Sequence, residues 1–313
     1  MNPEQIQHEK QAIVERFGEW TAHNIYLASG VYTIGNQIVG DEVKLRRITQ
    51  LVVDIAKKPL QELRVLDLAC LEGLYGMELA RHGAEVVGIE GREANLAKAQ
   101  FTKKVLDLDH LTLIQDDVRN LNVEQHGYFD VVLCLGILYH LEVPDIFLFL
   151  EHLSQVCQGF AVIDTHVSVV AERSHTHNGN TYWGASYQEH APESNLDERA
   201  QDLWASLDNV TSFWFTRPSL YNILSHLGFT SIYECHYPSE VGKPSDRITL
   251  LAIKGQPQPL HSAPLMADQS IPPLPELSNP PIQSGLQPPI HEAPSHKFSM
   301  RSLMQRLKVL LNG

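Results

Sequence analysis

Residues 65–76 have the sequence Val65-Leu66-Asp67-Leu68-Ala69-Cys70-Leu71-Glu72-Gly73-Leu74-Tyr75-Gly76. The apolar run up to Leu68 predicts a buried strand, and the residues after it predict a tight turn that leads into a helix. In an open sheet of parallel strands, ligands bind at the carboxyl ends of the strands, where turns of this kind lie. The stretch therefore predicts an α/β fold with a ligand site at this turn.

Helical and strand patterns alternate along the chain on either side of this stretch. Val131, Val132 and Leu133 are apolar at consecutive positions, as expected where helices cover both faces of a parallel sheet. The alternation predicts a doubly wound fold, and two final strands predict a hairpin that adds an antiparallel strand. Strands are predicted at 64–70, 85–90, 111–117, 128–136, 160–167, 231–237 and 247–254, and helices at 44–56, 75–82, 93–105, 144–157 and 217–227.

The chain divides by composition into a core and several appendages. Residues 1–43 predict an N-terminal cap, made of a polar helix and an aromatic stretch without periodicity. Residues 44–255 predict the core domain, and the polar, His-rich residues 168–211 predict an insertion over the site after the fifth strand. Residues 256–296 are rich in Pro and Ser and predict a disordered linker. Residues 297–313 predict a basic amphipathic helix that docks on a protein or on a membrane surface.

Charge and cysteine usage exclude several classes of function. A formal net charge of -13 argues against a broad nucleic-acid surface, because such surfaces rely on Lys and Arg to neutralise phosphates. The sequence has neither the pattern of a signal peptide nor an apolar run long enough to span a bilayer, so a cytoplasmic location is expected. The four cysteines lack C-x-x-C spacing, and the histidines lack compact ligand spacing. We therefore expect no disulfide framework and no metal site.

The turn after the first core strand resembles the first motif of class I S-adenosylmethionine-dependent methyltransferases, in which an acidic residue precedes three alternating glycines. Asp67 and Gly73 match this motif, whereas Ala69 and Leu71 occupy the two earlier glycine positions. The resemblance covers about residues 64–254 and implies a Rossmann-like methyltransferase fold with a mostly parallel, seven-stranded sheet. It also implies S-adenosyl-L-methionine as the cofactor. A non-catalytic scaffold or binding protein that keeps this fold remains an alternative.

Acidic residues end the second and third strands. Glu90 follows Asp67 by 23 residues, where a carboxylate accepts hydrogen bonds from both ribose hydroxyls of an adenosine ligand. A nicotinamide cofactor would need a G-x-G-x-x-G turn, which is absent. By the resemblance, Asp117 accepts a bond from the adenine amino group, although the Asp116–Asp117 pair could instead cap the next turn. The predicted cofactor-binding residues are Asp67, Ala69, Cys70, Gly73, Glu90, Gly91, Asp117, Val118 and Leu135.

Two stretches outside the cofactor motifs indicate which group of methyltransferases the chain resembles. Residues 20–33 begin with Trp20-Thr21-Ala22-His23-Asn24-Ile25-Tyr26-Leu27, and residues 212–218 are Ser212-Phe213-Trp214-Phe215-Thr216-Arg217-Pro218. Both look similar to segments of bacterial methyltransferases related to the tRNA wobble-uridine modifying group, many of whose relatives act on sugars or secondary metabolites. The acidic charge favours a small-molecule or glycan acceptor, methylated at oxygen. Methylation of a tRNA wobble uridine is the alternative.

The loop after the fourth strand carries the predicted catalytic residues, His140 and Tyr139. A hydroxyl acceptor must lose its proton, and the imidazole is the side chain suited to accept one near neutral pH. A packing role for His140 stays open, and Tyr139 shapes the methyl pocket or belongs to the core. Aromatic and Arg side chains offer flat faces and forked donors to sugars and carboxylates. The predicted acceptor-binding residues are Trp20, Asn24, Tyr32, His166, Trp183, Trp214 and Arg217.

Overall fold

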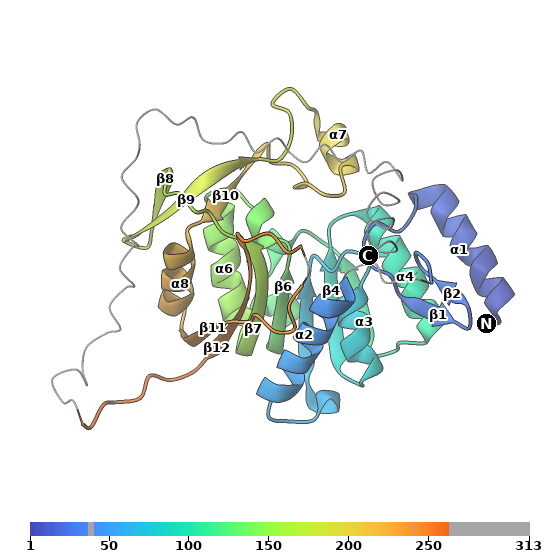
Figure 1. Cartoon of the computed structure of the whole chain (residues 1–313), viewed down its shortest axis with the longest axis horizontal. Coiled ribbons are helices and arrows are strands. Elements are labelled where there is room, and N and C mark those ends of the chain that lie inside the picture. The colour runs from blue at the N-terminus through green and yellow to red at the C-terminus, as the bar shows by residue number, and fades with distance from the viewer. Residues whose placement is uncertain (37–40, 241, 263–313) are drawn as a thin grey trace, which may run out of the picture. The chain divides into compact units, whose positions relative to one another are not determined.

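The computed structural model describes residues 1–36, 41–240 and 242–262 (Figure 1). Seven strands of this described part form the central sheet in the order β11-β12-β7-β6-β3-β4-β5. Neighbouring strands from β7 to β5 are parallel, whereas β12 runs antiparallel to both β7 and β11, as predicted. The strands are β3 (Arg64–Leu68), β4 (Glu85–Glu90), β5 (Leu111–Gln115), β6 (Phe129–Leu135), β7 (Cys157–His166), β11 (Phe229–Glu234) and β12 (Arg247–Lys254).

Helices pack on both faces of this sheet, which confirms the doubly wound prediction. Alternate residues of β6 enter different cores: Val131 and Leu133 lie in one hydrophobic cluster, and Val132 and Cys134 lie in the other. The first cluster includes residues of α2 (Asp41–Ile55), α3 (Leu74–Arg81) and α4 (Glu93–Leu106), and the second includes residues of α6 (Asp145–Val156) and α8 (Arg217–His226). Short elements connect them: η1 (Leu60–Glu62), η2 (Val118–Asn120), α5 (Val123–His126) and η3 (Leu138–His140).

The N-terminal segment folds as a helix and a small hairpin beside α4. Asn2 caps α1 (Pro3–Phe17) through a capping box with Gln5, so the helix begins where Pro3 is tolerated. Strands β1 (Tyr26–Ala28) and β2 (Val31–Tyr32) then pair antiparallel. These strands were not predicted, because two or three residues are too few to show a period.

The insertion contains more regular structure than its sequence suggested. Strands β8 (Arg173–His177), β9 (Asn180–Gln188) and β10 (Thr211–Phe215) form a three-stranded antiparallel sheet, and α7 (Leu196–Gln201) lies between the last two. The sequence predicted none of these three strands. Polar residues occupy both faces of β8 and much of β9, so the sequence lacks the hydrophobic alternation that would predict these strands. The three strands pair through their backbones. This sheet extends past residue 211 to Phe215.

The predicted linker and C-terminal helix fall largely outside the described residues. Residues 256–262 form neither helix nor strand, and residues 263–296 of the linker and the whole helix at 297–313 lie outside the described part. Among the helices that the structure describes, none is long and apolar enough to cross a membrane.

Candidate functional site

The turn after β3 adopts a left-handed backbone at three positions, of which only one is glycine. Ala69 has φ 51°, Leu71 has φ 53° and Gly73 has φ 88°. Left-handed conformations cost a non-glycine residue about 1–2 kcal/mol and persist where the surroundings hold them in place. Here Cys70 donates its backbone N–H to Ile89 at 3.0 Å. The turn therefore keeps the left-handed geometry at both positions where Ala and Leu replace the glycines of the motif.

Glu90, at the end of β4, is joined to this turn. Its Oε2 accepts the backbone N–H of Leu71 at 2.9 Å, and its Oε1 accepts the backbone N–H of Arg92 at 2.9 Å. Asn95 of α4 donates to the same carboxylate at 3.3 Å. Burial raises the pKa of Glu90, and these hydrogen bonds partly oppose that increase.

The surroundings of Glu90 fit a ribose. The Oδ1 atom of Asn95 is buried and has no hydrogen-bond partner among the described residues. A buried acceptor of this kind costs free energy unless a donor reaches it. Oε2 of Glu90 accepts one hydrogen bond and retains a lone pair, whereas Oε1 already accepts two. A vicinal diol supplies two donors, which matches a carboxylate and an amide oxygen on adjacent side chains.

Asp67 holds the turn and the first helix together. Its buried Oδ2 accepts the backbone N–H of Gly76 in α3 at 2.9 Å. Burial raises the pKa of Asp67 to about 7; the bond from Gly76 opposes this shift, and the nearby Glu90 charge adds to it. Asp67 and Glu90 thus form a pair of buried acids at the carboxyl ends of adjacent strands.

Glu72 anchors the N-terminal segment on the same turn. Its buried carboxylate accepts the backbone N–H groups of Thr21, Ala22 and His23 at 2.7 to 3.2 Å. Lys98 of α4 lies 3.4 Å from it and compensates its charge. Glu72 stands inside the quoted motif and was not predicted to have a role. Its signal would have been that Glu72 is the second carboxylate, after Asp67, in this mostly apolar stretch.

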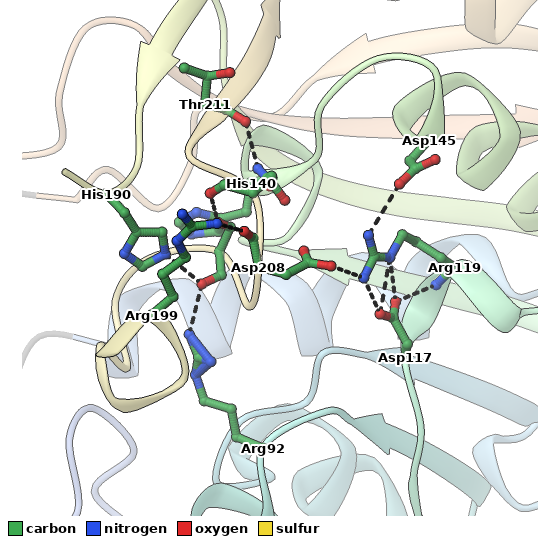
Figure 2. A network of polar contacts seen from close by, with 11 residues as sticks. Arg92, Asp117, Arg119, His140, Asp145, His190, Arg199, Asp208 and Thr211 are labelled. Carbon is green, nitrogen blue, oxygen red and sulfur yellow. Dashed lines mark hydrogen bonds and ion pairs between the residues drawn. The ribbon is translucent and has the colours of Figure 1, made fainter. Parts of the chain in front are cut away.

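Asp117 caps the turn that follows β5. Its side chain accepts the backbone N–H of Arg119 at 2.9 Å and pairs with the guanidinium of the same residue. Arg119 also contacts Asp145 of α6 at 3.1 Å and Asp208 of the insertion at 2.7 Å (Figure 2). The capping alternative is therefore present in the structure. The adenine contact of Asp117 stays a prediction.

The insertion lies against the tips of β4 and β5. Arg92 donates to the backbone carbonyls of Asp202 at 2.6 Å and of Ala205 at 2.8 Å. A Cβ built on Gly91 would stand only 2.7 Å from Leu207 Cδ1, so a larger residue at this position would displace the Leu207 side chain. We refer to residues 202–210 as the cover loop. It touches the predicted cofactor residues Gly91 and, through Arg119, Asp117.

His140 forms a pair with a carboxylate of the insertion. Its Nδ1 lies 2.9 Å from Oε2 of Glu189, just beyond the end of β9. Glu189 has only 1% of its side chain exposed, and it also accepts bonds from the Ser206 backbone N–H and the Ser212 hydroxyl. Burial favours the neutral acid, but the bonds from His140, Ser212 and Ser206 outweigh it and lower the pKa of Glu189. Glu189 was not predicted, because its pairing spans 49 residues.

Tyr139 and three other aromatic rings form a cluster beside this pair. The Trp214 ring stacks on Tyr187 at 4.4 Å between centroids and on His166 at 4.7 Å. The indole N–H of Trp214 donates to the Tyr139 carbonyl at 2.9 Å. The Tyr139 ring contacts His140 at 4.2 Å and His166 at 4.8 Å. The structure thus brings together four predicted site residues, namely Tyr139, His140, His166 and Trp214.

Asp164, at the end of β7, lies under this cluster among basic residues. It contacts Arg247 of β12 at 2.7 Å, Lys243 at 3.3 Å and Lys44 of α2 at 3.9 Å. Burial alone would raise its pKa, but these cations lower the pKa of Asp164 well below its usual range. The Arg247 guanidinium lies 5.7 Å from the centre of the Tyr139 ring. Lys44 comes from α2, whereas Lys243 and Arg247 lie close together, just before and at the start of β12. Both segments are distant in sequence from Asp164, so no local pattern predicted that these residues meet.

Other predicted acceptor residues lie apart from this cluster or serve the fold. Trp20 is buried against Phe101 of α4 at 5.8 Å. Asn24 accepts the backbone N–H groups of Ile34 and Gly35 and so stabilises the N-terminal turn.

The remaining three lie in the hairpin, in β9 and at the start of α8. The Tyr32 ring packs edge-on against Tyr26. Trp183 of β9 accepts the backbone N–H of Thr216 through its carbonyl. Arg217 begins α8 and pairs with Glu234 of β11 at 3.0 Å.

The other cofactor predictions sit at the strand ends, as the motif required. Cys70 and Val118 are buried, and Leu135 closes β6 with partial exposure. No group of three His, Cys, Asp or Glu residues arranged to hold a metal ion occurs in the part of the chain that the structure describes.

Comparison with known families places a methyltransferase domain on this sheet. Residues 65–159 match the family model described as a methyltransferase domain. The chain is similar to a ubiquinone biosynthesis O-methyltransferase of Acinetobacter baumannii strain AYE, with 37% identity over 82 residues, 26% of this chain and 34% of that protein. It is also similar to a tRNA U34 carboxymethyltransferase of Mannheimia succiniciproducens, with 33% identity over 132 residues, 37% of this chain and 38% of that protein. The chain thus spans about a third of these relatives.

Among solved structures, the fold is similar to that of the N-terminal domain of EvdMO1 in the presence of SAH and D-fucose. The TM-score is 0.61 and the identity is 24%, and the match covers 82% of this chain and 98% of that domain. This match covers more of the chain than the family model does.

Proposed function

We propose that this chain transfers a methyl group from S-adenosylmethionine to a hydroxyl of a small or glycan-like acceptor. The proposal starts from residues 65–159, which match a methyltransferase domain and form part of a class I fold. The observation that carries the proposal is the His140–Glu189 pair at the loop after β6. In such domains this loop separates the cofactor from the acceptor. A hydroxyl needs a base at this place more than an amine does.

The chain's own groups suit the cofactor side of the reaction. S-adenosylmethionine supplies a methyl group on a positively charged sulfur, which leaves as a neutral thioether. Glu90 and Asn95 would hold the ribose, and the left-handed turn at Ala69–Gly73 would place its backbone against the ligand. Gly91, the residue after β4, carries no side chain, and Leu207 of the cover loop lies against it.

The acceptor side depends on His140. Glu189 remains ionised near neutral pH and accepts a hydrogen bond from the Nδ1–H of His140. This leaves Nε2 as the nitrogen that receives the acceptor proton. The new bond joins the acceptor oxygen to the methyl carbon, and the hydroxyl proton passes to the imidazole. General-base assistance of this kind contributes about 10²–10⁴ in rate.

A sugar hydroxyl is the first acceptor class to test. The stacked rings of Tyr187, Trp214 and His166 offer flat faces of the kind that sugar rings contact. The fold neighbour was studied in the presence of SAH and D-fucose, and one curated relative is named an O-methyltransferase. The full chain should be incubated with isotopically labelled S-adenosylmethionine, a panel of free and nucleotide-linked sugars, and cell extract. Labelled O-methyl products support the proposal, and label found only on nitrogen or carbon contradicts it.

Methylation of a tRNA wobble uridine is a second candidate, favoured by the match to a tRNA U34 carboxymethyltransferase. The net charge of -13 weighs against it, because phosphate binding depends on Lys and Arg. Retention of bulk tRNA by the full chain at physiological salt, together with labelled tRNA in the same assay, would favour the RNA acceptor. Absence of both would leave the small acceptor.

A further inference from the structure

The carboxyl edge of the sheet holds a cavity of about 260 Å³ that belongs to none of the predicted cofactor residues. It lies between β11, β12 and α2. Sites for entire small ligands measure about 300–1,000 Å³, so this cavity has the size for one group of a larger molecule. Its ionisable wall is formed by Arg47, Arg217, Glu234, Cys235, His236, Glu240, Lys243 and Arg247.

Positive charge exceeds negative charge on this wall. Among the described residues, four Arg or Lys side chains line the cavity against two carboxylates, in a chain whose net charge is -13. Glu240 is shared by Arg47 and Lys243, and Glu234 pairs with Arg217. Including Asp164 and its partner Lys44 leaves the excess unchanged, with five cations against three carboxylates. The cavity is therefore a local basic site on an acidic protein.

One donor on this wall is not used. Arg47 has a side chain that is 2% exposed, and its Nε–H is buried without an acceptor among the described residues. Its other nitrogens bond to Glu240, to the Thr249 hydroxyl at 3.2 Å and to the Pro238 carbonyl. A buried unpaired donor on a charged group is costly unless an acceptor satisfies it.

Arg247 connects the cavity to the reaction site. It lines the cavity and also bonds to Asp164, and its Nη2 lies 3.6 Å from a Cβ position built on Gly136, in the loop after β6. Its register partner in β7 is His166, which stacks on Trp214. The Arg247 side chain therefore lines the cavity and also contacts the Tyr139 ring of the aromatic cluster.

We propose that this cavity binds an anionic group of the methyl acceptor, so that the acceptor is a sugar or similar small molecule that carries a phosphate or a carboxylate. The inference rests on the proposed function, because it assigns the cavity to the acceptor of the same site. Arg217, Lys243 and Arg47 supply the charge, and their forked or terminal donors suit either anion.

The test uses the full chain saturated with S-adenosylhomocysteine and three matched hexoses: glucose, glucose 1-phosphate and glucuronate. Calorimetry or saturation-transfer NMR measures binding of each. We expect one of the charged sugars to bind at least about tenfold more tightly than glucose, since charge-assisted hydrogen bonds distinguish them. The phosphate and the carboxylate arms identify the anion. Equal binding of all three sugars, including no binding of any, overturns the proposal.

Variants assign the effect to the cavity. Arg217→Gln removes a partly exposed cation and Lys243→Gln a more enclosed one, and each should remove most of the advantage of the charged sugar. Arg81→Gln is the control, because Arg81 lines a separate cavity at the end of α3 with Asp107 and Asp109. If Arg217→Gln and Lys243→Gln, folded by circular dichroism, bind the charged sugar as Arg81→Gln does, the site lies elsewhere.

The binding assay is separate from catalysis. If the chain binds S-adenosylhomocysteine and the charged sugar yet methylates no sugar, the cavity is supported and the proposed reaction fails. If the chain methylates neutral sugars and shows no preference for charged ones, the proposed reaction is supported and the anion site in the cavity fails.

Discussion

Nδ1 of His140 and Oε2 of Glu189 lie 2.9 Å apart, although one residue follows a core strand and the other belongs to the insertion. The pair is almost fully enclosed, with 15% of the His140 side chain and 1% of the Glu189 side chain exposed. The same carboxylate accepts the backbone N–H of Ser206 in the cover loop. The proposed base is therefore complete only when the insertion is folded against the sheet.

Replacement of this base should affect turnover and spare the cofactor. We expect His140→Gln to lower kcat by about 10²–10⁴, the usual contribution of a general base, with the Kd of S-adenosylhomocysteine nearly unchanged. Turnover is measured by labelled methyl transfer to the acceptor identified above, and Kd by calorimetry. His175→Gln, on β8 of the insertion, is the matched control and should keep full activity. Normal turnover of His140→Gln would show that another group takes the proton.

Loss of the Glu90 carboxylate should weaken cofactor binding. Hydrogen bonds to a charged group contribute about 1.5–3 kcal/mol, so Glu90→Ala should raise the Kd of S-adenosylhomocysteine by about 10–100-fold. Calorimetric titration measures this change. Glu93→Ala, with a side chain 68% exposed at the start of α4, is the control and should bind normally. An unchanged Kd in Glu90→Ala would refute the ribose assignment.

Asp67 should make stability depend on pH. Its pKa is raised to about 7 by burial, so the folded state keeps a proton that the unfolded state loses near pH 4. The folded state then binds more protons, and the free energy of unfolding falls as pH rises from about 4 to about 7.

Asp67→Asn keeps an acceptor for Gly76 and should lose this pH-dependent contribution. Urea unfolding at pH 5 and pH 8 measures it, and the wild type should lose roughly 2–4 kcal/mol more than the variant between these values. Equal pH dependence of the two proteins would show that Asp67 is ionised in the folded state throughout this range.

Arg92 should control the order of the cover loop. Its guanidinium donates to the carbonyls of Asp202, Ala205 and Ser206, and Arg92→Ala leaves these three without that donor. We expect backbone amides of residues 202–208 to exchange at least about tenfold faster in hydrogen–deuterium exchange, since local opening loses these bonds. Arg173→Ala, in β8, provides the comparison. If the two variants exchange alike in this loop, other contacts hold it.

Removal of residues 256–313 should leave a folded, cofactor-binding core. The last strand, β12, ends at Lys254 and lies between β7 and β11, so every strand of the described sheet is retained. Thermal unfolding and titration with S-adenosylhomocysteine test this expectation. A fall in Tm of more than about 10 °C would indicate that the removed segment belongs to the core, because 1 kcal/mol shifts Tm by roughly 2–4 °C in a domain of this size.

The sequence by itself determined the doubly wound sheet and the edge where a ligand binds. Consecutive apolar residues such as Val131 to Leu133 indicate a sheet that is covered on both faces. The turn that follows Leu68 lies at the carboxyl edge of that sheet. These are local signals, because hydrophobic period and turn chemistry act over a few residues. The strands of the core were accordingly predicted to within a few residues.

Only the tertiary structure decided which side chains complete the site. Glu189 pairs with His140 although they are 49 residues apart in the sequence. Asp164 pairs with Arg247, 83 residues later, and with Lys44, which precedes the first core strand. The antiparallel sheet of the insertion, built from polar residues, brings Glu189 and Trp214 to that place. Ion pairs between distant segments have no period along the chain, so the packing of the insertion onto the sheet, and not the local pattern, determines them.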